Sequence, residues 1–176
     1  MDSAENPVIP LKPNSIYVSS QFLISPNFHV ALLVTDSAGS ITIHEWAEDL
    51  SRETPERYFH RKVDAVKSYT DDGKLIYAYF KVAGYTSPGD DFDWVAMLAQ
   101  IFPKSLANWI ENRKNKISCR YFVLHSLVKL IERGYLVRKD TIADIEKIIY
   151  KISNELENEL GNMPEGETYH TRVIEI

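Results

Sequence analysis

The chain has 176 residues, of which 44% are apolar, 26% charged and 11% aromatic, and its net charge is −5. This is the composition of an ordinary globular protein, and the length suits one domain with its own core better than two. The acidic balance argues against a nucleic-acid-binding protein, because such proteins usually carry a basic excess or stripe. No DNA partner is therefore expected.

Cys119 is the only cysteine, so an internal disulfide is excluded and a reducing compartment is favoured. The N-terminal MDSAENPVIPLKP has neither the basic nor the apolar region of a secretory signal, and no stretch approaches the ~18 apolar residues of a membrane span. We therefore predict a cytoplasmic protein without a membrane span. No His/Cys spacing resembles a zinc-ligand pair, so neither a metal nor a cofactor is predicted.

Strands are predicted in the first half of the chain. Residues 1–13 contain three prolines and resemble an extended arm, and residues 47–61 are polar and give at most a short helix or an irregular segment. Gly39 and Gly73 fall in two turn-like connections. The β-prone segments are 16–18, 21–24, 28–35, 41–46, 63–69 and 74–82, the last two forming a second hairpin.

Helices are predicted in the second half. The expected segments are 91–101, closed by Pro103; 105–110, capped by Ser105; 118–133, capped by Ser118 and followed by Gly134; and 140–160, capped by Asp140 and followed by Gly161. Residues 162–176 form a polar, weakly β-like tail. Strands followed by helices predict an α+β fold: a single domain over 14–161, with an antiparallel sheet packed against helices.

Cys119 lies at the predicted start of a helix. There the unpaired N–H groups and the helix dipole favour the thiolate, which is the nucleophilic form of cysteine. A thiol nucleophile also needs a base, usually an imidazole held by a third polar group. A lone cysteine can equally be a small core residue, so the rest of the chain has to supply these partners.

Five histidines are available as the base. His60 and His170 lie in polar segments typical of a surface, and His125 is almost two turns along the same predicted helix as Cys119, too far round it to reach the sulfur easily. His29 opens an otherwise apolar strand and is the best candidate. His44 lies on the partner strand and could orient it.

The third residue depends on the pairing of strands 28–35 and 41–46. If Thr35 pairs with Ser40, His44 shares a face with His29; if the connection contains a bulge at Gly39, Glu45 shares that face instead. The pattern of the strand does not decide between them. We prefer His44, with Glu45 the alternative.

A strand histidine, a polar residue on the next strand and a cysteine opening a helix resemble the circularly permuted papain-like fold. Lecithin retinol acyltransferase-type proteins share this order, and their Asn-Cys-Glu-His-Phe-Val motif is partly matched by residues 118–123, SCRYFV. A closer resemblance is to an uncharacterised fungal domain family with Asn-His-Trp and Gly-Cys-Arg-Phe-Trp motifs. Here these motifs read NFHV at 27–30 and SCRYF at 118–122, and a similar Glu-Arg-Gly-Tyr-Leu segment occupies 132–136. The resemblance spans roughly residues 14 to 137.

The resemblance implies a cysteine acyl-transfer enzyme, either a hydrolase or an acyl or aminoacyl transferase, acting on a small-molecule or peptide amide, ester or thioester. In this interpretation Cys119 is the nucleophile, His29 the general base, and His44 or Glu45 its orienting group. The Cys119 N–H, with Asn115, would bind the developing oxyanion, and Arg120 and Trp46 are candidate substrate-binding residues.

Two other hypotheses remain open at this stage. The same fold could be a non-catalytic binding or scaffold domain in which the cysteine and the histidines serve packing. Alternatively, the protein could be a small-molecule enzyme in which the aromatic residues and Arg120 matter and the thiol does not.

Overall fold

A computed structural model describes residues 6–23, 27–48, 55–106 and 108–176. It is a mixed α+β domain with a six-stranded sheet in the order β5-β4-β3-β2-β7-β8. All neighbouring strands are antiparallel except β7 and β8, which are parallel. The strands are β2 (Ile16–Phe22), β3 (Phe28–Thr35), β4 (Ile41–Ala47), β5 (Arg57–Val63), β7 (Ile76–Lys81) and β8 (Arg172–Glu175). The α+β class and the largely antiparallel sheet were predicted.

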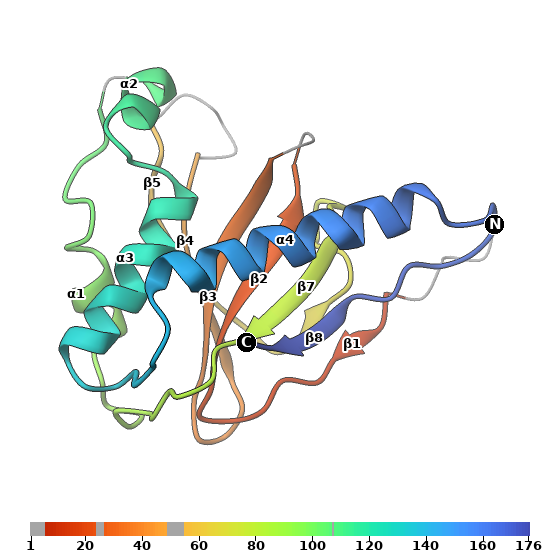
Figure 1. Ribbon diagram of the computed structural model, residues 1–176. Helices are drawn as coiled ribbons and strands as arrows, with labels where there is room; N and C mark the ends of the chain where they lie inside the picture. The colour runs from red at the N-terminus through yellow and green to blue at the C-terminus, as the bar shows by residue number, and fades with distance from the viewer. Residues whose placement is uncertain (1–5, 24–26, 49–54, 107) are drawn as a thin grey trace.

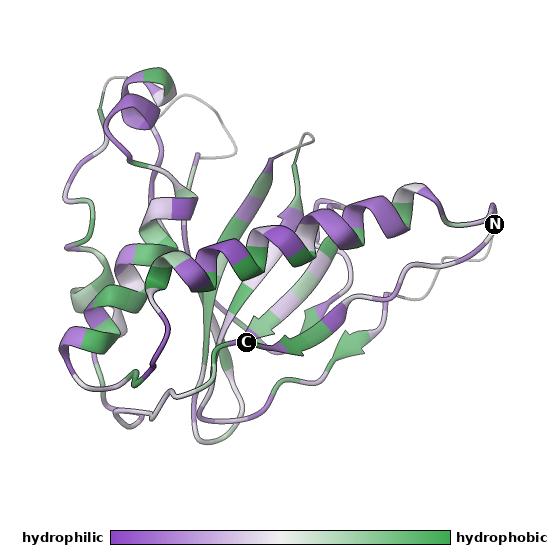
Figure 2. Cartoon of the chain, viewed as in Figure 1, coloured by the Kyte–Doolittle hydropathy of each residue, from purple (hydrophilic) through white to green (hydrophobic). Residues whose placement is uncertain are grey.

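One face of the sheet is covered by two long helices (Figure 1). Helix α3 (Cys119–Glu132) packs on β3 and β4, and α4 (Ile142–Gly161) crosses in front of β2 and β7. The main core lies between this face and the helices, and the apolar stripe of α4 turns toward the sheet while its polar side faces outward (Figure 2). The helical spacing of isoleucines and leucines in α4 thus buries one stripe of the helix, which includes Ile145, Ile149 and Leu156.

The other face of the sheet is covered by extended chain. Strands β1 (Val8–Ile9) and β6 (Val66–Lys67) pair with each other there, and a second, smaller apolar cluster lies beneath them. The N-terminal arm was predicted to be extended, but its pairing with β6 was not. The predicted hairpin of 63–69 with 74–82 is reduced to its turn end: a Tyr69–Leu75 bridge and backbone hydrogen bonds between Thr70 and Lys74 and between Ser68 and Ile76. Beyond that point β6 pairs with β1, and β7 lies between β2 and β8.

Strand β5 was missed because four of its seven residues are Arg, His or Lys. It is the edge strand beside β4, and charged residues such as Arg61 and Lys62 are typical of edges, where they oppose pairing with another chain. Residues 49–54 of the predicted polar segment lie outside the described residues.

The helices begin later than predicted in three cases. The first, α1 (Trp94–Leu98), is capped by Asp93; α2 (Trp109–Lys114) is capped by Asn108 and not Ser105; and α4 is capped by Thr141, which forms a capping box with Asp144. Helix α3 begins after Ser118, as predicted, and Gly134 follows its end with φ +76°. In the described part of the chain, no helix has the length and apolar character needed to cross a membrane.

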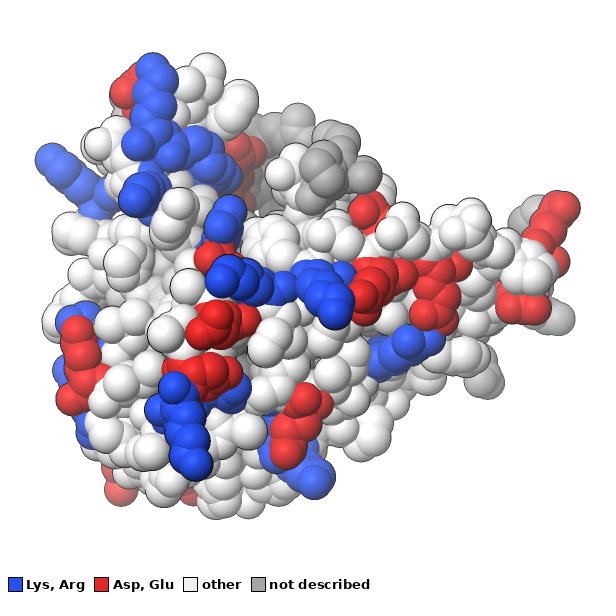
Figure 3. Space-filling view, viewed as in Figure 1, with Lys and Arg blue, Asp and Glu red and all other residues white. Residues whose placement is uncertain are grey.

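The face that carries α4 shows acidic and basic side chains intermixed (Figure 3). Arg120 pairs with Glu146 and Arg172 with Glu159 across this surface. Charges of both signs at such short spacing largely cancel along α4, whereas basic side chains gather at the upper left of the same view, where α2 lies (Figures 1 and 3).

Candidate functional site

The pairing of β3 with β4 determines which side chain of β4 reaches His29. Leu32 lies opposite His44, so His44 shares the face of Leu32, while Glu45 shares the other face with His29. The connection between the strands has Gly39 at φ +84° and an Asp36–Ser40 backbone hydrogen bond, and Thr35 pairs with Ile41. This is the bulged connection that was the alternative to direct Thr35–Ser40 pairing.

The thiol approaches His29 where β3 and β4 cease to be paired. Their ladder ends at Leu32–His44, and the first helical residue of α3, Cys119, lies near the part of β3 beyond that point. The His29 side chain and the Val30 backbone N–H are both close enough to the Cys119 sulfur to lower the pKa of the thiol. The sulfur is thus held between a strand N–H and an imidazole at the positive end of a helix.

The His29 ring joins Cys119 to Glu45. Its Nε2 lies 2.9 Å from Glu45 Oε2, and the two side chains are 17% and 20% exposed. The other carboxylate oxygen of Glu45 lies 3.8 Å from Arg61 Nε, too far for a hydrogen bond. Cysteine, histidine and a carboxylate therefore form a continuous chain of contacts.

The electrostatics of this chain favour the charged forms of the thiol and the imidazole. Burial lowers the pKa of His29, but its hydrogen bonds to Cys119 and Glu45 and the negative charges of both outweigh burial and raise this pKa to about 10. Burial raises the pKa of Cys119, yet the His29 hydrogen bond and charge, the Val30 N–H and the Arg113 charge together lower it below the ordinary thiol value. The pair is thereby stabilised as thiolate and imidazolium.

A second group of polar residues supports the start of α3, and the sequence had not indicated it. Arg113 pairs with the buried Glu56 at 2.5 Å and donates to the Ile117 carbonyl at 2.8 Å. Asn112, also buried, donates to Glu56 at 2.9 Å. The network fixes the turn before Cys119 and places a guanidinium charge near the thiol. It was missed because Glu56 and Arg113 are 57 residues apart.

The structure does not bring His44, the preferred orienting residue, to His29, and Glu45, the alternative, lies there instead. His44 is fully buried on the helix-covered face, where its Nδ1 is hydrogen-bonded to the Tyr58 hydroxyl at 2.8 Å. Burial and the nearby His60 lower its pKa to about 3, so it stays neutral. The extra residue in the hairpin connection is the cause, since it shifts the face of every β4 side chain by one position.

The three predicted substrate-binding residues have side-chain contacts with groups other than Cys119, His29 and Glu45. Arg120 pairs with Glu146 of α4 and stacks over Tyr150, so it joins two helices. Asn115 ends α2 and donates to the Glu111 carbonyl at 2.9 Å. Trp46 is 2% exposed and packs edge-to-face on Phe102. In each case local helix or core contacts occupy the side chain.

Within the described residues, no group of three or more His, Cys, Asp or Glu side chains is arranged to hold a metal ion. Comparisons of the chain with protein-family models, with curated proteins and with solved structures found no match.

Proposed function

We propose that the protein is a cysteine-nucleophile acyl-transfer enzyme with Cys119, His29 and Glu45 as its catalytic residues. The observation that carries the proposal is the imidazole of His29, which contacts the Cys119 thiol and also Glu45 at 2.9 Å. A core histidine also needs hydrogen-bond partners, but here the two partners are a thiol at a helix start and a carboxylate, which are the partners of a catalytic imidazole. His44, buried without a carboxylate, has a lowered pKa instead.

Each residue has a role that follows from its contacts. The Cys119 thiolate adds to the carbonyl carbon of an amide, ester or thioester, and the carbonyl oxygen takes the negative charge. His29 then gives its proton to the leaving group as the bond to that group breaks, which leaves an acyl group on the sulfur. In the second step His29 removes a proton from water or an amine, which attacks the acyl group and releases the thiolate.

Glu45 acts as the orienting group. Its hydrogen bond holds the imidazole in position, and its negative charge stabilises the imidazolium. The first-turn N–H groups of α3 have no intrahelical partner and are the donors for the oxyanion, while the N–H of Tyr121 is already capped by Ser118. Asn115 is not part of this proposal, because its side-chain amide caps α2.

The thiolate can be tested directly because Cys119 is the only cysteine. We expect the rate of iodoacetamide labelling, followed by intact mass from pH 4 to 10, to have a midpoint clearly below the ordinary thiol pKa of ~8.5. We also expect p-nitrophenyl acetate to add one acetyl group to the wild type and none to Cys119→Ser. A labelling midpoint at or above ~8.5 would refute the proposal.

A further inference from the structure

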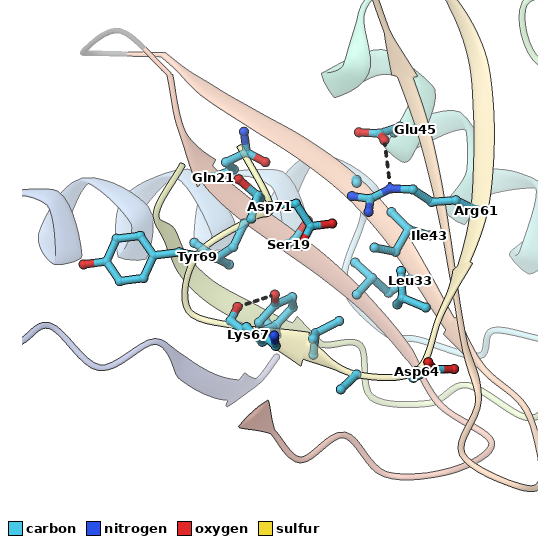
Figure 4. A pocket seen from close by; sticks show the side chains of 17 residues that line it. Ser19, Gln21, Leu33, Ile43, Glu45, Arg61, Asp64, Lys67, Tyr69 and Asp71 are labelled. Carbon is cyan, nitrogen blue, oxygen red and sulfur yellow. Dashed lines mark hydrogen bonds and ion pairs between the residues drawn. The ribbon is translucent and has the colours of Figure 1, made fainter. Parts of the chain in front are cut away.

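A cavity of about 340 Å³ lies on the sheet face opposite α3 and α4 (Figure 4). Its floor is formed by β2, β3 and β4, and the segment 64–71 covers it. The floor is hollow at its centre because two small residues, Ser19 and Ala31, lie directly opposite each other on neighbouring strands. The volume falls within the ~300–1,000 Å³ typical of small-molecule sites.

The cavity borders the candidate catalytic residues on one side. Glu45 lines it, and so does Gln21, the cross-strand partner of His29. Figure 4 shows Glu45 and Arg61 together at one end, with Gln21, Ser19 and Asp71 grouped at the other. Apolar side chains, among them Leu33, Ile76 and Tyr79, line the space between.

Several polar side chains that line the cavity have no hydrogen-bond or ion-pair partner among the described residues. The Gln21 amide, the Ser19 hydroxyl and the Asp71 carboxylate form no hydrogen bond or ion pair with any described side chain or backbone group. The guanidinium of Arg61 is 48% exposed, and its one ion pair in the described chain is the 3.8 Å approach to Glu45. Polar groups without partners around a concave, half-apolar surface are typical of a ligand site.

The charges define the kind of ligand. Five charged residues line the cavity: Glu45, Arg61, Asp64, Lys67 and Asp71. Glu45 is hydrogen-bonded to His29, and Asp64 and Lys67 on the segment 64–71 carry opposite charges that add up to no net charge on that segment. The charges that remain are a cation, Arg61, at one end and an anion, Asp71, at the other. A carboxylate can bind the planar fork of Arg61 through two hydrogen bonds, and an ammonium can bind Asp71.

We infer that this cavity binds a dipeptide-sized zwitterion, with its carboxylate on Arg61, its ammonium on Asp71 and its amide on Gln21 and Ser19. The apolar part of the molecule packs on Leu33, Ile76 and Tyr79. Binding requires no chemistry at Cys119, so this inference stands or falls separately from the proposed function.

The test uses three matched probes with the Cys119→Ser protein: glycyl-leucine, N-acetyl-glycyl-leucine, which lacks the ammonium, and glycyl-leucinamide, which lacks the carboxylate. Binding is followed by amide chemical shifts in NMR titrations. We expect saturable shifts with glycyl-leucine at Ser19, Gln21 and Ala31, and weakening of at least about fivefold for each blocked probe.

Two variants assign the ends of the ligand. Arg61→Gln should weaken glycyl-leucine but leave glycyl-leucinamide unchanged, and Asp71→Asn should weaken glycyl-leucine but leave the acetylated probe unchanged. Lys62→Gln and Asp91→Asn, exposed charges outside the cavity, are the controls and should change nothing. The absence of saturable shifts, or equal weakening of all probes by either variant, would overturn the inference.

Discussion

His29 and His44 lie on neighbouring strands and are both shielded from water, yet their pKa values shift in opposite directions. His29, next to a thiol and a carboxylate, has its pKa raised to about 10. His44, next to a tyrosine hydroxyl and another histidine, has its pKa lowered to about 3. Burial lowers both values, so the difference comes from the charges of the partners. The environment, and not the residue type, separates a candidate base from a core histidine.

The largest expected effect is on acylation of Cys119. His29→Gln should slow acylation by p-nitrophenyl acetate about 10²–10⁴-fold, because the variant loses the imidazolium that stabilises the thiolate and donates a proton to the leaving group. His44→Gln, the matched change on the next strand, should alter the rate less than about threefold. Rates are measured by intact mass, with circular dichroism to confirm folding. Equal rates for both variants would remove the distinction between the two histidines.

The proximity of His29 to Cys119 could be predicted from the sequence, but the contact of His29 with Glu45 could not. The strand histidine, the cap at Ser118 and the stop at Gly134 are local signals, and the structure contains them. Whether the Glu45 or the His44 side chain lies on the same face of the sheet as His29 depends on the number of residues in the turn between β3 and β4, since one extra residue reverses the faces. The hydrophobic pattern of the two strands does not reveal how many residues the turn contains.

The same reason explains the other differences. Strand β5 carries no apolar pattern because it is an edge, and the Arg113–Glu56 network joins positions far apart in the sequence. Both are consequences of tertiary packing. Arg120 was indicated by its position beside the cysteine, but a helix residue next to Cys119 points in a different direction, here toward α4.

A second prediction concerns stability in acid. Between its folded pKa of about 3 and its ordinary 6.5, His44 binds fewer protons in the folded than in the unfolded state, so stability is lost as the pH falls below 6.5. From pH 7 to 4 this amounts to about 3 kcal/mol. The raised pKa of His29 has the opposite effect on stability. Its stabilising contribution to the free energy of unfolding is fully present below pH 6.5 and is lost as the pH rises toward 10.

The measurement is urea unfolding of the wild type and of His44→Gln at pH 4, 5, 6 and 7. Glu45 and other carboxylates with lowered pKa values also destabilise the protein in acid, but they do so in both proteins. The two proteins are compared by how steeply the free energy of unfolding falls with pH. The difference between these two slopes gives the effect of His44 protonation, whatever the stability of the variant at pH 7. Parallel slopes would show that His44 is protonated in the folded protein.

The smallest expected effect separates two arginines near the start of α3. Arg113 holds the turn before Cys119 through the Ile117 carbonyl, and its charge lowers the thiol pKa, whereas Arg120 is paired with Glu146 and turned toward α4. Arg113→Gln should raise the midpoint of iodoacetamide labelling by a few tenths of a pH unit, which slows labelling about twofold on the acid side of the midpoint.

Arg120→Gln, the change of equal charge one residue after the thiol, should leave the midpoint unchanged and lower stability only slightly, since exposed ion pairs contribute about 0.2–1 kcal/mol. If Arg120→Gln moved the midpoint as much as Arg113→Gln, the thiol would respond to overall charge and not to the network that holds its helix. Comparing the midpoint shifts of the two variants thus tests whether the pKa of Cys119 depends on arginines close in the sequence or on those in tertiary contact with the start of α3.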